Sequence, residues 1–89
     1  MSPAAFTTEE IRAEIKKLIA RVTEREPDEI PDEAHYMEEL GVDSLMAMEV
    51  MIAVDKKFKI DIPEEEFNHA TNVNQSVALV EKWLAAASA

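Results

Sequence analysis

Apolar residues recur at helical spacing along most of this chain, and no segment alternates convincingly in the manner of a β-strand. In the first expected helix the apolar positions fall mostly three or four residues apart, at Ile11, Ile15, Leu18, Ile19 and Val22. Thr7 and Glu10 form a capping-box pattern ahead of this face, and Phe6 with Ile11 occupies the positions of a hydrophobic staple. Because a residue before proline avoids the helical region, we expect this helix to end before Pro27.

A second helix is expected to begin at or just after Ser44, with Ser44 as its N-cap, and to run to Phe58 without Gly or Pro. At about 100° per residue, its apolar side chains form two groups. The first group is the expected core face and consists of Ala47, Val50, Met51, Val54 and Phe58. The second, which we call the apolar row, lies on roughly the opposite side and consists of Leu45, Met48 and Ile52.

The apolar row has two interpretations. If it faces away from the core of so small a bundle, it is exposed and indicates a surface for a partner protein. The alternative is that these residues simply belong to the core, as methionines at helical spacing usually do.

Residues 27–43, between these two helices, form a loop that is long for a small domain. Its expected anchors in the core are Ile30, Tyr36, Met37 and Leu40. Pro63, followed by three glutamates, predicts a short third helix, and Asn72 is the expected cap of the last helix. The apolar stripe of that last helix consists of Val73, Val77, Leu79, Val80, Trp83 and Leu84.

These patterns predict an all-α fold, a small four-helix bundle with three longer helices, one short helix and a long loop between helices 1 and 2. With 89 residues, the chain has room for a single domain over residues 1–89. We expect a folded core of about residues 6–84 and short flexible termini, with residues 85–89 frayed.

The chain contains no cysteine, so it has no disulfide, thiolate nucleophile or thiolate metal site of its own. Any thiol chemistry therefore has to come from an attached group. The N-terminus lacks the features of a secretory signal, and no apolar stretch approaches the length of a membrane span. We therefore expect a soluble cytoplasmic protein without membrane insertion.

Negative charge is concentrated in one part of the chain. The net charge of the chain is −10. Ten acids and no Lys or Arg lie between Glu26 and Asp55, while the remaining segments hold nine acids and nine bases, whose charges cancel. Such a field repels nucleic acid and steers basic protein surfaces toward the segment around Ser44. The alternative is that the acids only keep a small domain soluble.

The run Gly41-Val42-Asp43-Ser44-Leu45 contains the only glycine of the chain, which suggests a positive φ or a close backbone approach just before the serine. At a helix start, an attached phosphate is favoured by the unpaired amides and the helix dipole. Serine is also a common cap with no further role, so this run alone leaves both interpretations open.

The longer pattern is more specific. The run Glu38-Glu39-Leu40-Gly41-Val42-Asp43-Ser44-Leu45, followed by Glu49, Phe58, Ile62-Pro63-Glu64-Glu65, Thr71 and Val73, resembles the acyl carrier protein family over nearly the whole chain. The resemblance implies that Ser44 is esterified to 4'-phosphopantetheine, which a phosphopantetheinyl transferase takes from coenzyme A. It also implies that Asp43 is a motif residue that helps to hold the metal ion during this modification.

In this family the protein is a non-catalytic carrier of acyl intermediates, held as thioesters and delivered to fatty acid or polyketide-type enzymes. The resemblance implies partners with basic docking surfaces: acyltransferases, ketosynthases or acyl-activating enzymes. We expect a monomer that docks through Leu45, Met48, Glu49, Ile52 and Asp55. Residues expected to line a buried acyl chain are Met37, Met51, Val54, Phe58 and Val73.

Three residues depart from many fatty acid carriers. Met46, Lys56 and Lys57 stand where those carriers have acids, which suggests a discrete, specialised carrier. Two other classes remain open: a peptidyl or aminoacyl carrier, and an unmodified acidic helical adaptor that does not need Ser44.

Other chemistry is weakly supported. His35 and His69 have no companion ligands in a metal-binding pattern, and residues 28–33 lack the ligand spacing of a calcium loop. No sequence signature pairs Ser44 with a catalytic base. We therefore predict neither a catalytic residue nor a metal site.

Overall fold

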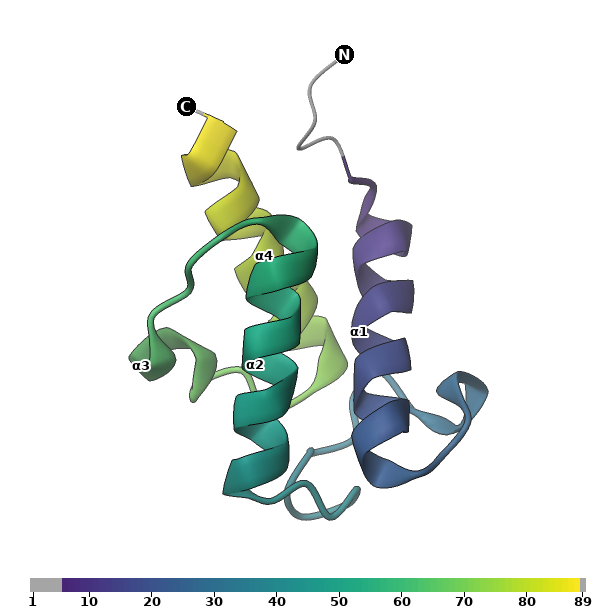
Figure 1. Ribbon diagram of the computed structural model, residues 1–89. Helices are drawn as coiled ribbons and strands as arrows, with labels where there is room; N and C mark the ends of the chain where they lie inside the picture. Colours follow the sequence, from purple (N-terminus) through teal and green to yellow (C-terminus); the bar gives the residue numbers. More distant parts are fainter. Residues whose placement is uncertain (1–5, 89) are drawn as a thin grey trace.

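The computed structural model describes residues 6–88, and within them every regular element is helical. The elements in chain order are α1 (Thr8–Thr23), the 3-10 turn η1 (Pro27–Glu29), α2 (Ser44–Phe58), α3 (Glu64–Phe67) and α4 (Val73–Ser88). Helix α1 runs opposite to α2 and α4, so the long loop lies where α1 ends and α2 begins (Figure 1). The predicted all-α fold of three longer helices and one short helix is confirmed.

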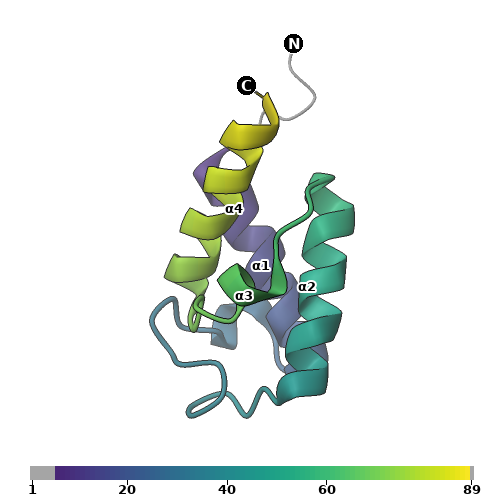
Figure 2. The same cartoon turned by 90° about the vertical axis from the view of Figure 1, so that its left-hand side faces the viewer.

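Helix α1 contacts both α2 and α4, and the short α3 contacts α4 (Figures 1 and 2). The start of α1 follows the predicted capping box: Thr7 Oγ1 accepts from the Glu10 N–H at 3.1 Å, and Glu10 Oε1 accepts from the Thr7 N–H at 2.8 Å. The helix ends at Thr23, ahead of Pro27 as expected. Phe6, just before the cap, packs edge-to-face on Phe58, with ring centroids 4.9 Å apart.

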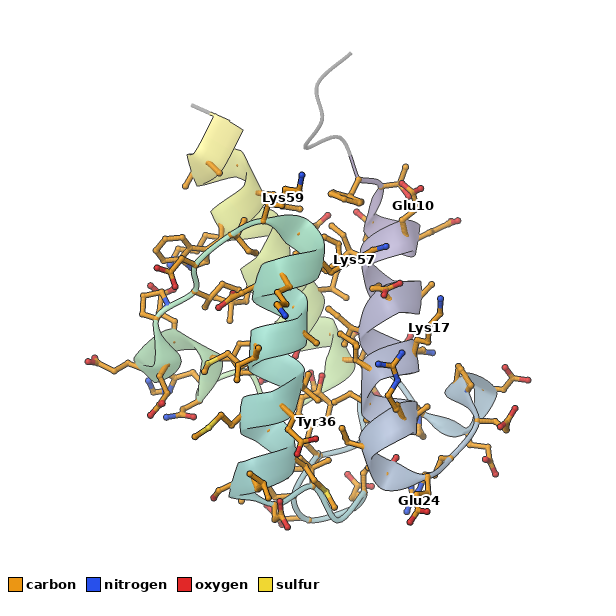
Figure 3. All side chains as sticks on the ribbon, in the orientation of Figure 1. Glu10, Lys17, Glu24, Tyr36, Lys57 and Lys59 are labelled. Atoms are coloured by element: carbon orange, nitrogen blue, oxygen red, sulfur yellow. The ribbon has the colours of Figure 1, made fainter. Side chains whose placement is uncertain are left out.

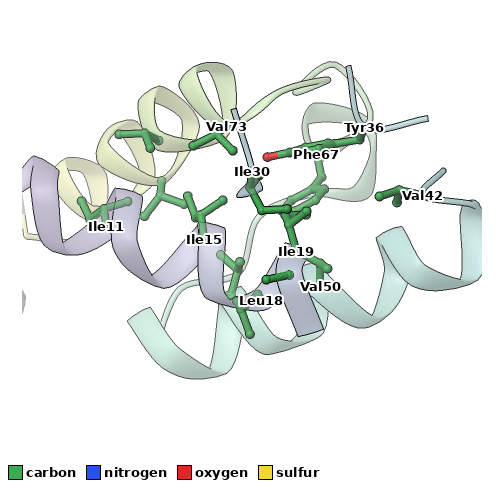
Figure 4. Close-up of a cluster of buried hydrophobic side chains, with 14 of the residues drawn as sticks. Ile11, Ile15, Leu18, Ile19, Ile30, Tyr36, Val42, Val50, Phe67 and Val73 are labelled. Atoms are coloured by element: carbon green, nitrogen blue, oxygen red, sulfur yellow. The ribbon is translucent and has the colours of Figure 1, made fainter. Parts of the chain in front are cut away.

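The core lies between α1, α2, α4 and the long loop (Figure 4). Its most buried large side chains, each less than 2% exposed, are Ile11, Ile15, Ile19, Ile30, Val54, Val73 and Val80. On α2, Val50, Val54 and Phe58 are buried as predicted, while Ala47 and Met51 are half-buried at the margin of the core.

Three of the four expected loop anchors, Ile30, Tyr36 and Leu40, are buried, but the prediction for Met37 is wrong, since this side chain is 59% exposed. The loop turns sharply after Tyr36, whose carbonyl accepts from the Val42 N–H at 2.9 Å. Tyr36 and Leu40 point into the core on this turn, and Met37 is left outside.

Helix α4 begins as predicted, with Asn72 Oδ1 accepting from the Gln75 N–H at 2.9 Å. The helix continues to Ser88, in keeping with the high helix propensity of its alanines, and the fraying expected from Ala85 onward stays a prediction. The other expected flexible ends, residues 1–5 and 89, lie outside the described residues. None of the helices within residues 6–88 combines the length and apolarity that crossing a lipid bilayer requires.

Candidate functional site

Ser44 is the first residue of α2, and the expectation that it is the N-cap is wrong. The cap is Asp43, which has an extended backbone and whose Oδ1 accepts from the Met46 N–H at 2.9 Å. Aspartate and serine cap helices about equally well, so two adjacent candidates compete and the earlier one takes the position. The Ser44 side chain is exposed and has no hydrogen-bond partner within residues 6–88.

The backbone before Ser44 is fixed on both sides of a turn. Gly41 has a φ of 70°, and a Cβ added there would meet no atom within 4 Å. Its role is therefore the positive φ and not a close approach. Val42, the next residue, is buried at 3% exposure, which anchors the chain two residues before Ser44.

An open groove of about 360 Å³ begins at Ser44. Its other lining residues come from α2, the loop, both ends of α3 and the residue that follows α3: Ala47, Met48, Met51, Met37, Glu64, Phe67 and Asn68. A smaller cavity of about 80 Å³ lies next to it and is lined in part by the buried residues Ile19, Tyr36, Val42 and Val50. We call these two spaces the outer groove and the inner cavity.

Of the residues expected to line an acyl chain, Met37 and Met51 border the outer groove, and Met37 also borders the inner cavity. Val54, Phe58 and Val73 are buried in the core and border neither space. Ala47 and Phe67 border both spaces and were not expected there. The only signal for Phe67 in the sequence is an aromatic residue directly after three glutamates.

The apolar row is exposed: Leu45 by 65%, Met48 by 47% and Ile52 by 51%. The interpretation of these residues as core is therefore excluded. Glu49 is exposed on the same helix.

Asp55 differs from the other expected docking residues. It is half-buried, and its Oδ1 accepts from the Ile62 N–H at 3.2 Å, across the link between α2 and α3. Burial raises the pKa of the Asp55 carboxyl, the Ile62 hydrogen bond lowers it, and the nearby Asp61 charge raises it further. Asp55 thus holds the chain that leads into α3.

The acidic segment stays largely unpaired. Of the ten acids between residues 26 and 55, only Asp32 forms an ion pair with Lys or Arg in the part that the structure describes. Its carboxylate lies 2.5 Å from Lys16 Nζ and 3.4 Å from Arg12 Nη1, and the Lys16 hydrogen bond leads in lowering its pKa. The remaining acids, in the long loop and on α2, keep a negative charge that no Lys or Arg neutralises within the described residues.

Within residues 6–88, no three or more His, Cys, Asp or Glu side chains are grouped so that they could hold a metal ion, and this includes both histidines. His35 takes part in the loop instead. Its Nδ1 accepts from the Glu38 N–H at 3.2 Å, and its Nε2 lies 3.4 Å from the Glu38 carboxylate.

The surroundings of Ser44 fit a phosphopantetheine group. The hydroxyl is exposed and is not used by the helix cap, so a bond to it disturbs no contact of the fold. Phosphate next to the first turn of α2 is favoured by the helix dipole and the free amides. The outer groove offers a mostly apolar surface beside Ser44.

Comparison with known proteins gives an independent view of the same segment. Residues 13–80 match the family model for the phosphopantetheine attachment site. The chain is 34% identical over 68 residues to the acyl carrier protein of Wolinella succinogenes, an overlap that covers 76% of this chain and 90% of that protein. It is 33% identical over 78 residues to the meromycolate extension acyl carrier protein of Mycolicibacterium smegmatis, covering 88% of this chain and 79% of that protein.

The fold agrees with these relatives. An acyl carrier protein structure from Enterococcus faecalis superimposes with a TM-score of 0.75, covering 88% of this chain and 99% of that one, at 23% identity. Sequence and fold together show that the chain belongs to the acyl carrier protein family, whose members carry covalently attached 4'-phosphopantetheine.

Proposed function

We propose that Ser44 is the attachment residue for 4'-phosphopantetheine and that the chain carries acyl groups as thioesters on this arm. The observation that carries the proposal is the division of roles at the start of α2: Asp43 caps the helix, so the exposed Ser44 hydroxyl is free of structural contacts. The arm supplies the terminal thiol that a chain without cysteine lacks. No catalytic step is assigned to the protein itself.

The first partner is a phosphopantetheinyl transferase, which takes the group from coenzyme A. In this proposal, Asp43 helps to hold the metal ion during that transfer. Asp43 Oδ1 accepts the hydrogen bond of the helix cap, so the other carboxylate oxygen, Oδ2, is the one left for a contact with the metal ion.

Further partners are acyltransferases, ketosynthases or acyl-activating enzymes with basic surfaces. The exposed apolar row supplies aliphatic contacts, and Glu49 with the unpaired acids of the loop supplies steering. Because these charges are exposed, the rate of association should fall as salt is added. A cytoplasmic location and a monomeric state remain predictions.

We infer a specialised carrier of fatty acid or polyketide type. Lys56 and Lys57 are exposed near the end of α2, where they reduce the negative charge of that helix. Met46 is half-buried against the core, so its effect on partners is weaker than the sequence suggests. Loading by a fatty acid synthesis ketosynthase, compared with that of an ordinary carrier, tests this inference, and equal rates would remove its basis.

The attachment is tested by incubating the protein with coenzyme A, magnesium and a broad-specificity transferase and then measuring the intact mass. We expect a phosphopantetheine adduct on the wild type and on Ser88→Ala, a control serine at the end of α4, and none on Ser44→Ala. Circular dichroism should show unchanged helix content in Ser44→Ala, because its side chain holds no structural contact. No adduct on the wild type favours the adaptor, and an adduct on Ser44→Ala rejects Ser44 as the attachment residue. Loading with an amino acid by an adenylating enzyme would favour the aminoacyl carrier.

A further inference from the structure

The outer groove and the inner cavity share four residues, which form a common wall between them. The shared residues are Met37 from the loop, Ala47 from α2, Phe67 from the end of α3, and Asn68. Ser44 borders the outer groove and not the inner cavity. An acyl chain that enters the inner cavity from the outer groove therefore passes this wall.

Phe67 is the main obstacle in the wall. It is the last residue of α3 and only 8% exposed, whereas Met37 and Asn68 are exposed and Ala47 is small. Figure 4 shows Phe67 with Tyr36, Val42 and Val50 at one end of the core. A long, mobile side chain such as Met37 can move aside at little cost, but a buried ring is held by its neighbours.

The inner cavity is small. Its volume of about 80 Å³ is roughly half of the 150 Å³ that holds a benzene ring in an apolar protein cavity, which corresponds to about three carbons. Its inner wall offers hydrocarbon contacts, because the Tyr36 hydroxyl is bonded to Ser76, and Ser76 does not border the cavity. The space therefore suits the unsubstituted end of an alkyl chain.

We propose that Phe67 is a specificity-determining residue that limits how many carbons of an acyl chain on Ser44 are buried. With the ring in place, only a short chain end is enclosed, and further carbons remain in the outer groove. A smaller side chain at position 67 joins the two spaces and encloses a longer chain. A larger side chain at Ala47 narrows the passage and has the opposite effect. This proposal rests on the attachment of the acyl arm to Ser44.

The test loads wild type, Phe67→Leu and Ala47→Leu with butanoyl, octanoyl or dodecanoyl groups. Phe58→Leu is the matched control, because Phe58 is a buried phenylalanine that borders neither space. Two quantities are measured for each chain length: the rate at which hydroxylamine cleaves the thioester, and the shift of the thermal midpoint relative to the unloaded form.

In the wild type we expect the protection from hydroxylamine and the shift of the thermal midpoint to stop increasing with chain length already at short chains. In Phe67→Leu, octanoyl should be cleaved at least about fourfold more slowly than in the wild type, the equivalent of one more buried methylene at about 0.8 kcal/mol. In Ala47→Leu, protection should fall below that of the wild type for every chain. Phe58→Leu should lower the midpoint of all forms and leave the dependence on chain length as in the wild type.

Three results would overturn the proposal. The dependence of protection on chain length could be unchanged in both Phe67→Leu and Ala47→Leu, or it could change as much in Phe58→Leu as in Phe67→Leu. Protection could also shift in the same direction in Phe67→Leu and Ala47→Leu. If Phe67→Leu does not fold, Ala47→Leu decides by itself. The absence of any adduct on Ser44 is a separate outcome, because it rejects the proposed function before chain lengths are compared, and this inference with it.

Discussion

The Tyr36 hydroxyl oxygen lies 2.7 Å from the Ser76 hydroxyl oxygen, and both side chains are buried. This hydrogen bond joins the long loop to α4 across the core. The backbone strengthens the same link, since the Tyr36 N–H donates to the Thr71 carbonyl at 2.9 Å. Because Tyr36 also borders the inner cavity, the pair fixes one wall of the space beside the candidate site.

Removing either hydroxyl of this pair should destabilise the fold. Tyr36→Phe leaves the buried Ser76 hydroxyl without its partner, and Ser76→Ala leaves the buried Tyr36 hydroxyl without its partner. Each single variant should lose about 1–3 kcal/mol of unfolding free energy. In the double variant no polar group is left unpaired, so its loss of unfolding free energy should be smaller than the sum of the two single losses. Urea unfolding of the four proteins measures this. Additive losses would show that the two hydroxyls do not act as a pair.

The same pair predicts a loss of stability at alkaline pH. Burial raises the pKa of Tyr36 from 10.0 to about 12, although the Ser76 hydrogen bond acts in the opposite direction. The folded state thus favours the neutral phenol. The stabilisation is complete below about pH 10 and is lost as the pH rises from there through about 12. Tyr36 is the only tyrosine of the chain, so the ultraviolet absorbance of tyrosinate reports its ionisation directly. A midpoint near 10 in the folded protein would contradict this prediction.

Asp43 allows the cap of α2 to be separated from the charge beside Ser44. Asp43→Ala removes the bond to the Met46 N–H and should cost about 0.5–2 kcal/mol of unfolding free energy. Asp43→Asn keeps a good cap without the charge, so its stability should stay close to that of the wild type.

The rate of phosphopantetheine transfer to these two variants then isolates the role of the charge. If Asp43 helps to hold the metal ion, transfer should slow in both variants, although only Asp43→Ala is destabilised. Transfer at the wild-type rate to Asp43→Asn would limit Asp43 to a role in the fold.

The helices could be predicted from the sequence because their signals are local. The capping box of Thr7 and Glu10, the stop before Pro27 and the cap at Asn72 each depend on residues within a few positions of one another. The exposed apolar row followed from the angular spacing along one helix. Periodicity alone could not exclude that Leu45, Met48 and Ile52 were core, because that depends on how the other helices pack.

The errors concern features set by contacts between distant segments or by close competition. Asp43 and Ser44 are adjacent and equally good caps, so the sequence does not decide between them. Met37 is exposed because the loop turns after Tyr36. The outer groove and the inner cavity lie where α3 and the loop meet α2. Val54 and Phe58 border neither space, and the place of Phe67 beside both could be recognised only from the fold.

Asp55→Asn should not weaken the protein at neutral pH. The pKa of the Asp55 carboxyl is raised mainly by burial, so the folded state favours its uncharged form. An amide oxygen can still accept from the Ile62 N–H without carrying the charge. We expect a thermal midpoint at or above that of the wild type at neutral pH. The difference should shrink on acidification, because the wild-type carboxyl then becomes uncharged as well. A clear loss of stability at neutral pH would show that the charge itself is needed.

Glu66 should behave in the opposite way. Its Oε1 accepts from Lys82 Nζ at 2.9 Å and from Trp83 Nε1 at 3.2 Å, which ties α3 to α4. The bond from Lys82, followed by that from Trp83, lowers the pKa of the Glu66 carboxyl. This contribution is present above the ordinary pKa of the carboxyl and is lost as the pH falls through the lowered value.

Glu66→Ala should therefore change the fluorescence of Trp83, the only tryptophan, more than Glu66→Gln does, because the amide keeps one acceptor oxygen. Adjacent Glu65, which is exposed and has no ion pair within residues 6–88, supplies the control Glu65→Ala. Equal fluorescence in the Glu66→Ala and Glu65→Ala variants would show that the Trp83 contact does not hold α3 in solution.

The start of α1 and the end of α4 lie at the opposite end of the bundle from the start of α2, whose first residue is Ser44 (Figures 1 and 3). Anchoring the protein to a sensor chip or bead through either of these ends would leave the serine facing the solution. Partner enzymes could then be passed over one immobilised sample in its unloaded and loaded forms, with the start of α2 turned away from the support.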